Sequence, residues 1–233
     1  MSAREQAAAE PEERVRVPVW DWPVRGFHWA LVLLVVASVV TVEIGGNAME
    51  WHIRSGFAIL TLVLFRVLWG FFGSRHARFS SFLGGPGKVI AYMKAMKSGS
   101  KAPQVGHNPL GGWAVIALLL VLLFQAGTGL FSNDDIATDG PLVKLISKDF
   151  SDAITSLHRR NAWILFALVG VHIAANLFYL VALKENLIRP MITGTKELPR
   201  RYADAAADGG GSAKALALLA LCAFAVWWIV KKL

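Results

Sequence analysis

Apolar residues along the chain gather into five blocks, at about residues 26–44, 53–72, 112–131, 162–183 and 213–230. Each block is close to the twenty residues that an α-helix needs to cross the hydrocarbon core of a bilayer. Alternation with a period of two residues, which is typical of a transmembrane barrel, is absent. The pattern therefore predicts an all-α membrane protein with five transmembrane helices.

The segments around these blocks suggest four parts. We expect an N-terminal tail over residues 1–19, a four-helix domain over 20–190, a linker over 191–212 and a fifth transmembrane helix over 213–233. The tail is long and acid-rich for a cleavable signal, so the first span is expected to be retained. Residues 85–99 and 141–157 each predict a short amphipathic helix at a membrane surface, and the second could receive a partner protein. Residues 203–212, "ADAAADGGGS", predict a flexible connection.

Basic residues are distributed unevenly between the joining segments. Residues 73–107 hold six Lys and Arg with no acidic residue and residues 184–202 hold five, whereas residues 132–160 hold four against five Asp. The positive-inside rule then predicts that the N-terminus lies in the cytoplasm and the C-terminus outside. Topology and contact with anionic membrane lipid account for the net charge of +8, so no nucleic-acid partner is expected.

Four histidines fall at two levels of this predicted bundle. His158 and His172 are fourteen residues apart, about 40° short of four full turns, so both rings face the same way, roughly 21 Å apart along the fourth span. His52 opens the second span on the outer side, and His28 lies near the inner end of the first. Antiparallel helices then give two pairs, His52 with His158 and His28 with His172.

Two facing imidazoles suit a haem iron with two axial ligands. Polar groups at membrane depth are costly and usually mark function, and helical bundles build haem sites between facing helices. Zinc is less suitable, because closed zinc sites need four ligands. The alternative for a single histidine is a ring bonded to a backbone carbonyl, but four in two matched pairs favour ligation. One cysteine, Cys222, and no C-x-x-C-H motif exclude covalent c-type haem and an iron–sulfur cluster.

Cations near the two levels could meet the propionates of such haems. Arg66 lies on the same stripe as His52, near the inner level, and Arg25 is three residues before His28. Gly56, four residues after His52, would let a flat ring approach closely, although small residues also serve helix packing. Three further arginines are candidates at the outer level, with ordinary interfacial charge as the alternative: Arg54, Arg159 and Arg160.

Several motifs in order resemble a known family. The stretches "FHWALVLLVV", "WHIRSGFAILTLVLFRVLWGFFGSRHARFSSF", "GHNPLGGWAVIALLL" and "LHRRNAWILFALVGVHIAANL" are similar to those of the bacterial cytochrome b561 and Ni/Fe-hydrogenase-type cytochrome b family, over about residues 18–195. The resemblance implies a four-helix core holding two haem b groups. It also implies that the axial ligands are His28, His52, His158 and His172.

The family resemblance also implies a function. Electrons would pass between the quinone pool and a redox partner, either a hydrogenase or a periplasmic cytochrome c. The protein could also form a homodimer. Two arginines after His158 and the fifth span depart from the simplest members and leave the partner undecided. One alternative is a stand-alone quinone reductase that oxidises superoxide at an outer basic patch, and another is a haem-free membrane anchor or metal transporter.

A quinone site is expected at the inner side, near Arg25, Arg66, His107 and Asn108. The alternative for Asn108 and Pro109 is a helix start, with Asn as the cap and Pro in the first turn, and this interpretation carries more weight.

Overall fold

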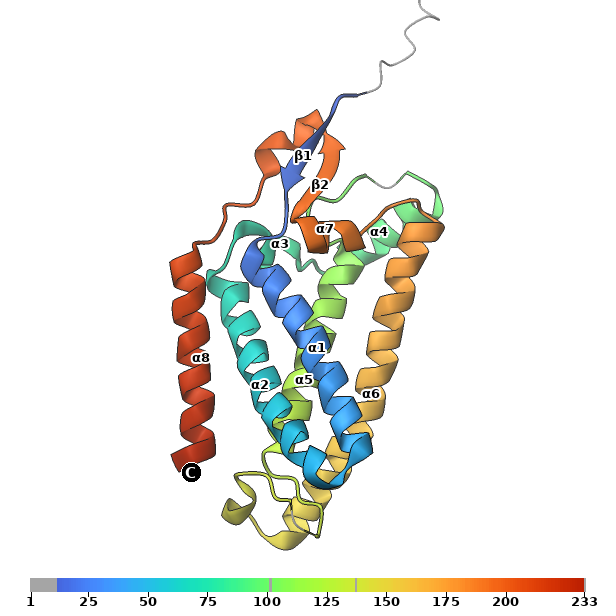
Figure 1. Cartoon of the computed structure of the whole chain (residues 1–233). Helices are drawn as coiled ribbons and strands as arrows, with labels where there is room; N and C mark the ends of the chain where they lie inside the picture. The colour runs from blue at the N-terminus through green and yellow to red at the C-terminus, as the bar shows by residue number, and fades with distance from the viewer. Residues whose placement is uncertain (1–11, 101, 137, 233) are drawn as a thin grey trace, which may run out of the picture.

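A computed structural model of the chain describes residues 12–100, 102–136 and 138–232. Each of its five long helices is apolar and long enough to cross a membrane, which confirms the five predicted spans. Figure 1 shows these helices running side by side: α1 (Trp22–Ile44), α2 (Met49–Phe72), α5 (Pro109–Gly129), α6 (Lys148–Val181) and α8 (Ser212–Lys232).

Helix α6 starts well before its apolar block. Ser147 is its N-cap and accepts a hydrogen bond from the backbone N–H of Phe150, and Lys148 pairs with Asp152 one turn further on. These local contacts favour helix, so the C-terminal part of the segment expected as a separate surface helix over residues 141–157 instead continues into the span. His158 consequently lies in the third turn of α6 and not at its start.

Helix α2 is the centre of the bundle. It packs against α1 on one side, α5 on another and α8 on a third, while α6 packs against α5. Helices α1 and α6 make little direct backbone contact with each other. The apolar core between α2, α5 and α6 is formed by Ile59, Val63, Leu119, Leu122 and Leu165.

The two ends of the bundle differ in structure. One end, here called the sheet end, carries a two-stranded sheet and several short helices, and the opposite end, the loop end, carries residues 45–48 and 130–147 (Figure 1). The loop end includes the 3-10 helices η1 (Gly46–Ala48) and η3 (Val143–Leu145). The helices of the sheet end are η2 (Arg75–Ala77), α3 (Phe79–Phe82), α4 (Pro86–Lys97), α7 (Ile188–Thr193) and η4 (Arg200–Ala205).

Helix α4 agrees with the short helix predicted for residues 85–99. Its Ile90 and Met93 are exposed and stand beside Lys94 and Lys97, as an amphipathic surface helix requires.

The sheet joins segments for which the sequence predicts a tail and a linker. Strand β1 (Arg14–Pro18) pairs antiparallel with β2 (Thr195–Pro199), so Val17 lies opposite Lys196. Val17, Val19 and Leu198 are almost fully buried. The run "RVRVPV" thus contains the period-two alternation expected to be absent, and η4 occupies the first part of residues 203–212. Residues 1–11 of the expected tail lie outside the described residues.

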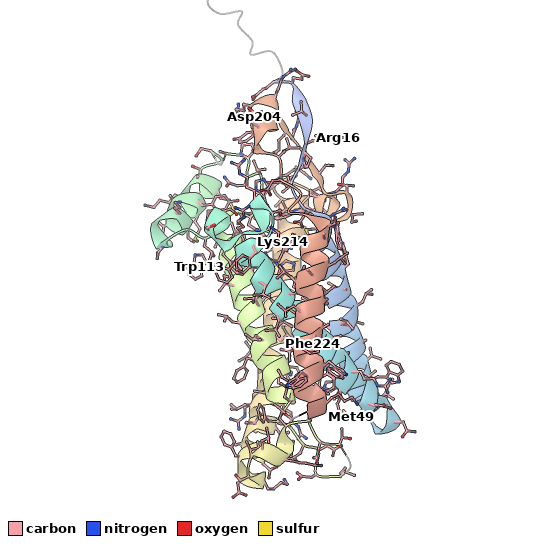
Figure 2. All side chains as sticks on the ribbon, turned by 90° about the vertical axis from the view of Figure 1, so that its left-hand side faces the viewer. Arg16, Met49, Trp113, Asp204, Lys214 and Phe224 are labelled. Atoms are coloured by element: carbon pink, nitrogen blue, oxygen red, sulfur yellow. The ribbon has the colours of Figure 1, made fainter. Side chains whose placement is uncertain are left out.

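Helix α8 packs along the outer face of α2. Figure 2 shows it in front of the bundle, with Lys214 toward the sheet end and Phe224 toward the loop end. Ala215, Cys222 and Val226 are its buried residues, and the Nε1–H of Trp22 donates to Ser212 Oγ at 2.9 Å. The fifth helix therefore lies beside the four-helix bundle and not within it.

Candidate functional site

One stripe of α6 carries two of the candidate histidines. His158, Leu165, His172 and Tyr179 follow one another at seven-residue intervals, which places them on nearly the same face of the helix. Leu165 and Tyr179 are buried. The stripe therefore faces the bundle, and the structure brings each of its histidines to a partner on another helix.

The loop-end pair consists of His52 on α2 and His158 on α6. Their ring centroids are 6.2 Å apart, with an angle of 83° between the planes. His52 Nδ1 lies 2.9 Å from the carbonyl oxygen of Ser38, and His158 Nδ1 lies 3.0 Å from that of Gln125. A carbonyl oxygen only accepts, so in both rings Nδ1 carries the proton and Nε2 keeps a lone pair that can bind a metal.

Hydroxyl and amide groups surround these two rings. Ser38 Oγ lies 3.1 Å from His52 Nδ1, and Thr128 Oγ1 lies 3.2 Å from His158 Nδ1. Gln125 Nε2 lies 3.0 Å from His158 Nε2, while Gln125 Oε1 accepts a hydrogen bond of 2.7 Å from Asn161 Nδ2. The sequence reasoning missed Gln125 and Asn161, although amide side chains inside apolar spans are an available signal.

The sheet-end pair consists of His28 on α1 and His172 on α6. Their ring centroids are 6.4 Å apart, with an angle of 49° between the planes. His28 Nδ1 is buried, and neither ring nitrogen of His28 has a hydrogen-bond partner among the described residues. His172 Nε2 lies 3.4 Å from Asn176 Nδ2, which is a long contact. This pair therefore matches the loop-end pair in spacing but lacks its carbonyl partners.

Two arginines are held near the sheet-end pair. Arg66 is 3% exposed, its guanidinium carbon is 5.5 Å from the ring centroid of Phe79, and its Nη1 is buried with no hydrogen-bond partner within the described chain. Arg25 donates from Nη1 to the carbonyl oxygen of Ile192 at 2.5 Å, and its Nε is likewise buried and unpartnered. Arg66 is thus a buried cation, and unpaired charge in an apolar interior is costly, whereas Arg25 is half-buried with its Nε enclosed.

The nearest acidic group is already engaged. Asp21 Oδ1 accepts from the backbone N–H of Val24 at 2.8 Å, and Oδ2 accepts from Trp69 Nε1 at 3.0 Å. These bonds cap α1 and tie it to α2. Asp21 can attract Arg66 over some distance, but no ion pair joins it to either arginine in the described structure.

The arginines predicted near the outer level of histidines lie beside acidic or aromatic side chains. Arg54 pairs with Glu50 and lies over the ring of Trp51, at 5.1 Å from its centroid. Arg159 and Arg160 line an open recess of about 270 Å³ that also contains Asp135 and Asp152. These cations therefore share their surroundings with carboxylates, whereas the carboxylate near Arg66, Asp21, already bonds Val24 N and Trp69 Nε1. A Cβ at Gly56 would meet no atom within 4 Å, so there is space beside this residue.

His107 and Asn108 lie at the start of α5. The His107 ring packs between Trp20 and Phe82, with centroid distances of 4.6 and 4.5 Å, and its Nδ1 is buried without a partner in the described chain. Burial first, and the nearby Arg66 next, lower the pKa of His107 to about 3, so the ring is neutral at physiological pH. Asn108 accepts from Gly111 N at 2.7 Å, which confirms the helix-start interpretation.

Each histidine pair offers a metal only two protein ligands. Over the ranges that the structure describes, no three His, Cys, Asp or Glu side chains gather where they could hold a metal ion. A metal bound between two imidazoles would therefore take its other ligands from outside these side chains, such as a cofactor or water.

Comparison with known proteins agrees with the family resemblance found in the sequence. A family model described as "Prokaryotic cytochrome b561" matches residues 19–194. A probable Ni/Fe-hydrogenase B-type cytochrome subunit of Bradyrhizobium diazoefficiens is 24% identical, over 79% of this chain and 87% of the relative. The probable Ni/Fe-hydrogenase B-type cytochrome subunit of Azotobacter vinelandii is 28% identical, over 78% of this chain and 91% of the relative. A probable Ni/Fe-hydrogenase 1 B-type cytochrome subunit of Escherichia coli K12 is 25% identical, over 76% of this chain and 88% of the relative. No solved structure matches.

Proposed function

Because the chain belongs to the prokaryotic cytochrome b561 family, we propose that it is a dihaem membrane cytochrome that carries electrons between a redox protein and the quinone pool. One haem b would lie between His52 and His158 and the other between His28 and His172. When bound, each haem supplies a one-electron ferric/ferrous couple. With both axial positions filled by imidazole, neither iron would keep a position for a substrate.

The spacing of the histidine rings carries this proposal. An imidazole nitrogen binds a transition metal at about 2 Å. In a five-membered ring with bonds of about 1.35 Å, each atom lies about 1.15 Å from the centroid. Two imidazoles on opposite sides of one iron then have centroids about 6.3 Å apart. The two pairs stand at 6.2 and 6.4 Å, which agrees with bis-imidazole ligation at both levels.

The neighbouring residues fit the same cofactor. Nδ1 of His52 and Nδ1 of His158 each donate to a carbonyl, which orients the rings and leaves a lone pair on each Nε2. At His158 iron would replace Gln125 Nε2, which lies 3.0 Å from this nitrogen. Arg25 and Arg66 carry unpartnered buried N–H groups that suit the carboxylates of haem propionates. The space beside Gly56 would admit the edge of a flat ring. Arg54 and Arg159 are weaker candidates for propionate contacts, because carboxylates already stand beside them.

A hydrogenase is the favoured redox partner. The relatives named above are described as probable Ni/Fe-hydrogenase B-type cytochrome subunits, and this chain covers most of their length. A periplasmic cytochrome c remains the other candidate. The positive-inside rule would place the sheet end, with its basic segments, in the cytoplasm of a bacterium and the loop end in the periplasm, where such a partner would dock.

Quinone would bind at the sheet end. His107 Nδ1 is a buried polar atom without a partner among the described residues, close to Arg66, and could bond a quinone carbonyl. Asn108 is a poorer candidate than the sequence predicts, because its side chain already bonds Gly111 N and the hydroxyl of Tyr179. The alternative of superoxide oxidation at the loop end receives less support, since Arg54 is paired with Glu50.

The absorption spectrum of the purified protein tests the proposal. The expected result is a red protein with a sharp low-spin b-type spectrum that changes on reduction and is extractable as non-covalent haem. A colourless preparation from cells with ample haem would contradict it and would favour the haem-free anchor or metal transporter.

A further inference from the structure

We propose that one face of helix α4 binds an anionic phospholipid of the leaflet that covers the sheet end, with the lipid phosphate between Lys94 and Lys97. This surface lies outside the histidine pairs, and the inference does not depend on haem. Three observations carry it: the two unlike faces of α4, the recess between its exposed side chains, and the charge and position of the helix.

One face of α4 is anchored to the bundle. Tyr92 is buried, and its hydroxyl oxygen lies 2.7 Å from that of Tyr179 on α6. The hydroxyl of Tyr179 also donates to Met96 Sδ at 3.8 Å and accepts from Asn108 Nδ2, at the start of α5, at 3.0 Å. These bonds fix the rotation of α4 about its own axis, so the opposite face of the helix points away from the bundle.

The exposed face combines apolar and basic side chains. Its members are three or four residues apart, which places them on one side of a helix: Ile90, Met93, Lys94 and Lys97. Together they line a recess of about 290 Å³. This volume is near the lower limit for ligand pockets, so it suits a phosphate and the glycerol beside it, while the acyl chains stay in the leaflet.

The charge of this face favours an anion. Residues 73–107 contain no Asp or Glu. Among the described residues, no carboxylate lies within ion-pair distance of Lys94 or Lys97. Glu185, which is near Tyr92, pairs with Lys196 at 2.7 Å. The two ammonium groups of α4 are therefore available to a lipid with net negative charge, and a zwitterionic lipid should gain less from them.

The position of α4 places this face at the level of the lipid headgroups. Figure 2 shows α4 reaching out to one side of the bundle beside Trp113. Trp113 is exposed, and its Nε1–H donates to the carbonyl oxygen of Gly84, just before α4, at 3.0 Å. Tryptophan near the end of a span is typical of the membrane interface. Ile90 and Met93 would then enter the edge of the hydrocarbon region while the lysine side chains reach phosphate.

Lipid binding to the purified full-length protein in a non-ionic detergent tests the inference. Native mass spectrometry measures bound phosphatidylglycerol and, in parallel, phosphatidylcholine with the same acyl chains, and the wild type should bind the first more tightly. Lys94→Gln combined with Lys97→Gln should weaken phosphatidylglycerol binding roughly 25-fold, because each lysine near an anionic surface contributes about fivefold. Lys94→Arg combined with Lys97→Arg, which keeps both charges, should retain the binding.

A matched pair of lysines at the loop end provides the control. Lys144→Gln combined with Lys231→Gln removes the same charge from exposed positions and should leave the affinity unchanged. Glycerol 1-phosphate, which carries the phosphate without acyl chains, should not displace the lipid. Equal binding of the two lipids by the wild type, an equal loss in the control pair, or displacement by glycerol 1-phosphate would overturn the inference.

Discussion

Gly70 leaves room for the aromatic ring that packs against Arg66. A Cβ at this position would lie 2.2 Å from Cε2 of Phe79, well inside van der Waals contact. The same Phe79 ring lies beneath the guanidinium of Arg66 and packs edge-on against Phe82, which in turn contacts His107. A small residue in α2 therefore fixes a row of side chains that reaches the candidate quinone site.

We expect Gly70→Ala to lower the free energy of unfolding by about 1–3 kcal/mol, because the ring of Phe79 must shift in a packed interior. Thermal unfolding in detergent, followed by circular dichroism, measures the change. Gly87→Ala is the control, since a Cβ there meets no atom within 4 Å. Equal melting temperatures for Gly70→Ala and wild type would show that the ring is not confined in this way.

At the scale of single residues, the sequence predicts which histidines pair better than it predicts the groups that bond their rings. Histidines at the same depth of the predicted spans give the pairs His52 with His158 and His28 with His172. The structure brings the rings of both pairs together. The carbonyl groups that bond the loop-end rings belong to the backbone, so no residue type marks them. Gln125 is different, because a polar amide inside a span is visible in the sequence.

Helix α1 shows how an element is fixed by a polar residue outside its apolar block. Asp21 caps the helix through Val24 N and also bonds Trp69 Nε1 on α2, which is fully buried. One carboxylate therefore sets both the start of α1 and its position against α2.

We predict that Asp21→Ala costs about 2–4 kcal/mol of stability, because it removes an N-cap and leaves a buried indole N–H unsatisfied. Asp21→Asn keeps an acceptor for the cap and should recover at least half of the loss. Urea or thermal unfolding in detergent compares the two variants. An alanine variant as stable as the asparagine variant would contradict this role.

Element boundaries were predictable only where hydrophobicity decides them. Hydropathy locates all five spans, whereas Asp21 and Ser147 start α1 and α6 before the apolar blocks begin. Strands β1 and β2 have five residues each and are far apart in the sequence. Such short strands gain their stability from a partner that a local pattern does not reveal.

At the scale of the whole molecule, α8 is an addition to a bundle that is complete without it. All four candidate ligands come from α1, α2 and α6, and α8 contacts the outer face of α2 through Ala215, Cys222 and Val226. Its start is fixed by the bond of Trp22 to Ser212 and by Lys214, which lies 5.8 Å from the ring centroid of Trp69.

Deleting residues 207–233 should therefore leave the haem content per chain unchanged and lower only the thermal stability. Haem extraction and protein quantification on the truncated and full-length chains measure the first, and unfolding in detergent measures the second. Loss of a haem on truncation would mean that α8 supports a ligand-bearing helix directly.

The stoichiometry of haem in single-ligand variants tests the central claim most directly. Haem b per chain should be two in the wild type and one in both His52→Ala and His172→Ala, with the two variants retaining spectroscopically different haems. The control His76→Ala, whose ring bonds the carbonyl of Ala205 at the sheet end, should keep two. A wild type with one haem or none, or histidine variants that both keep two, would contradict the two-level site.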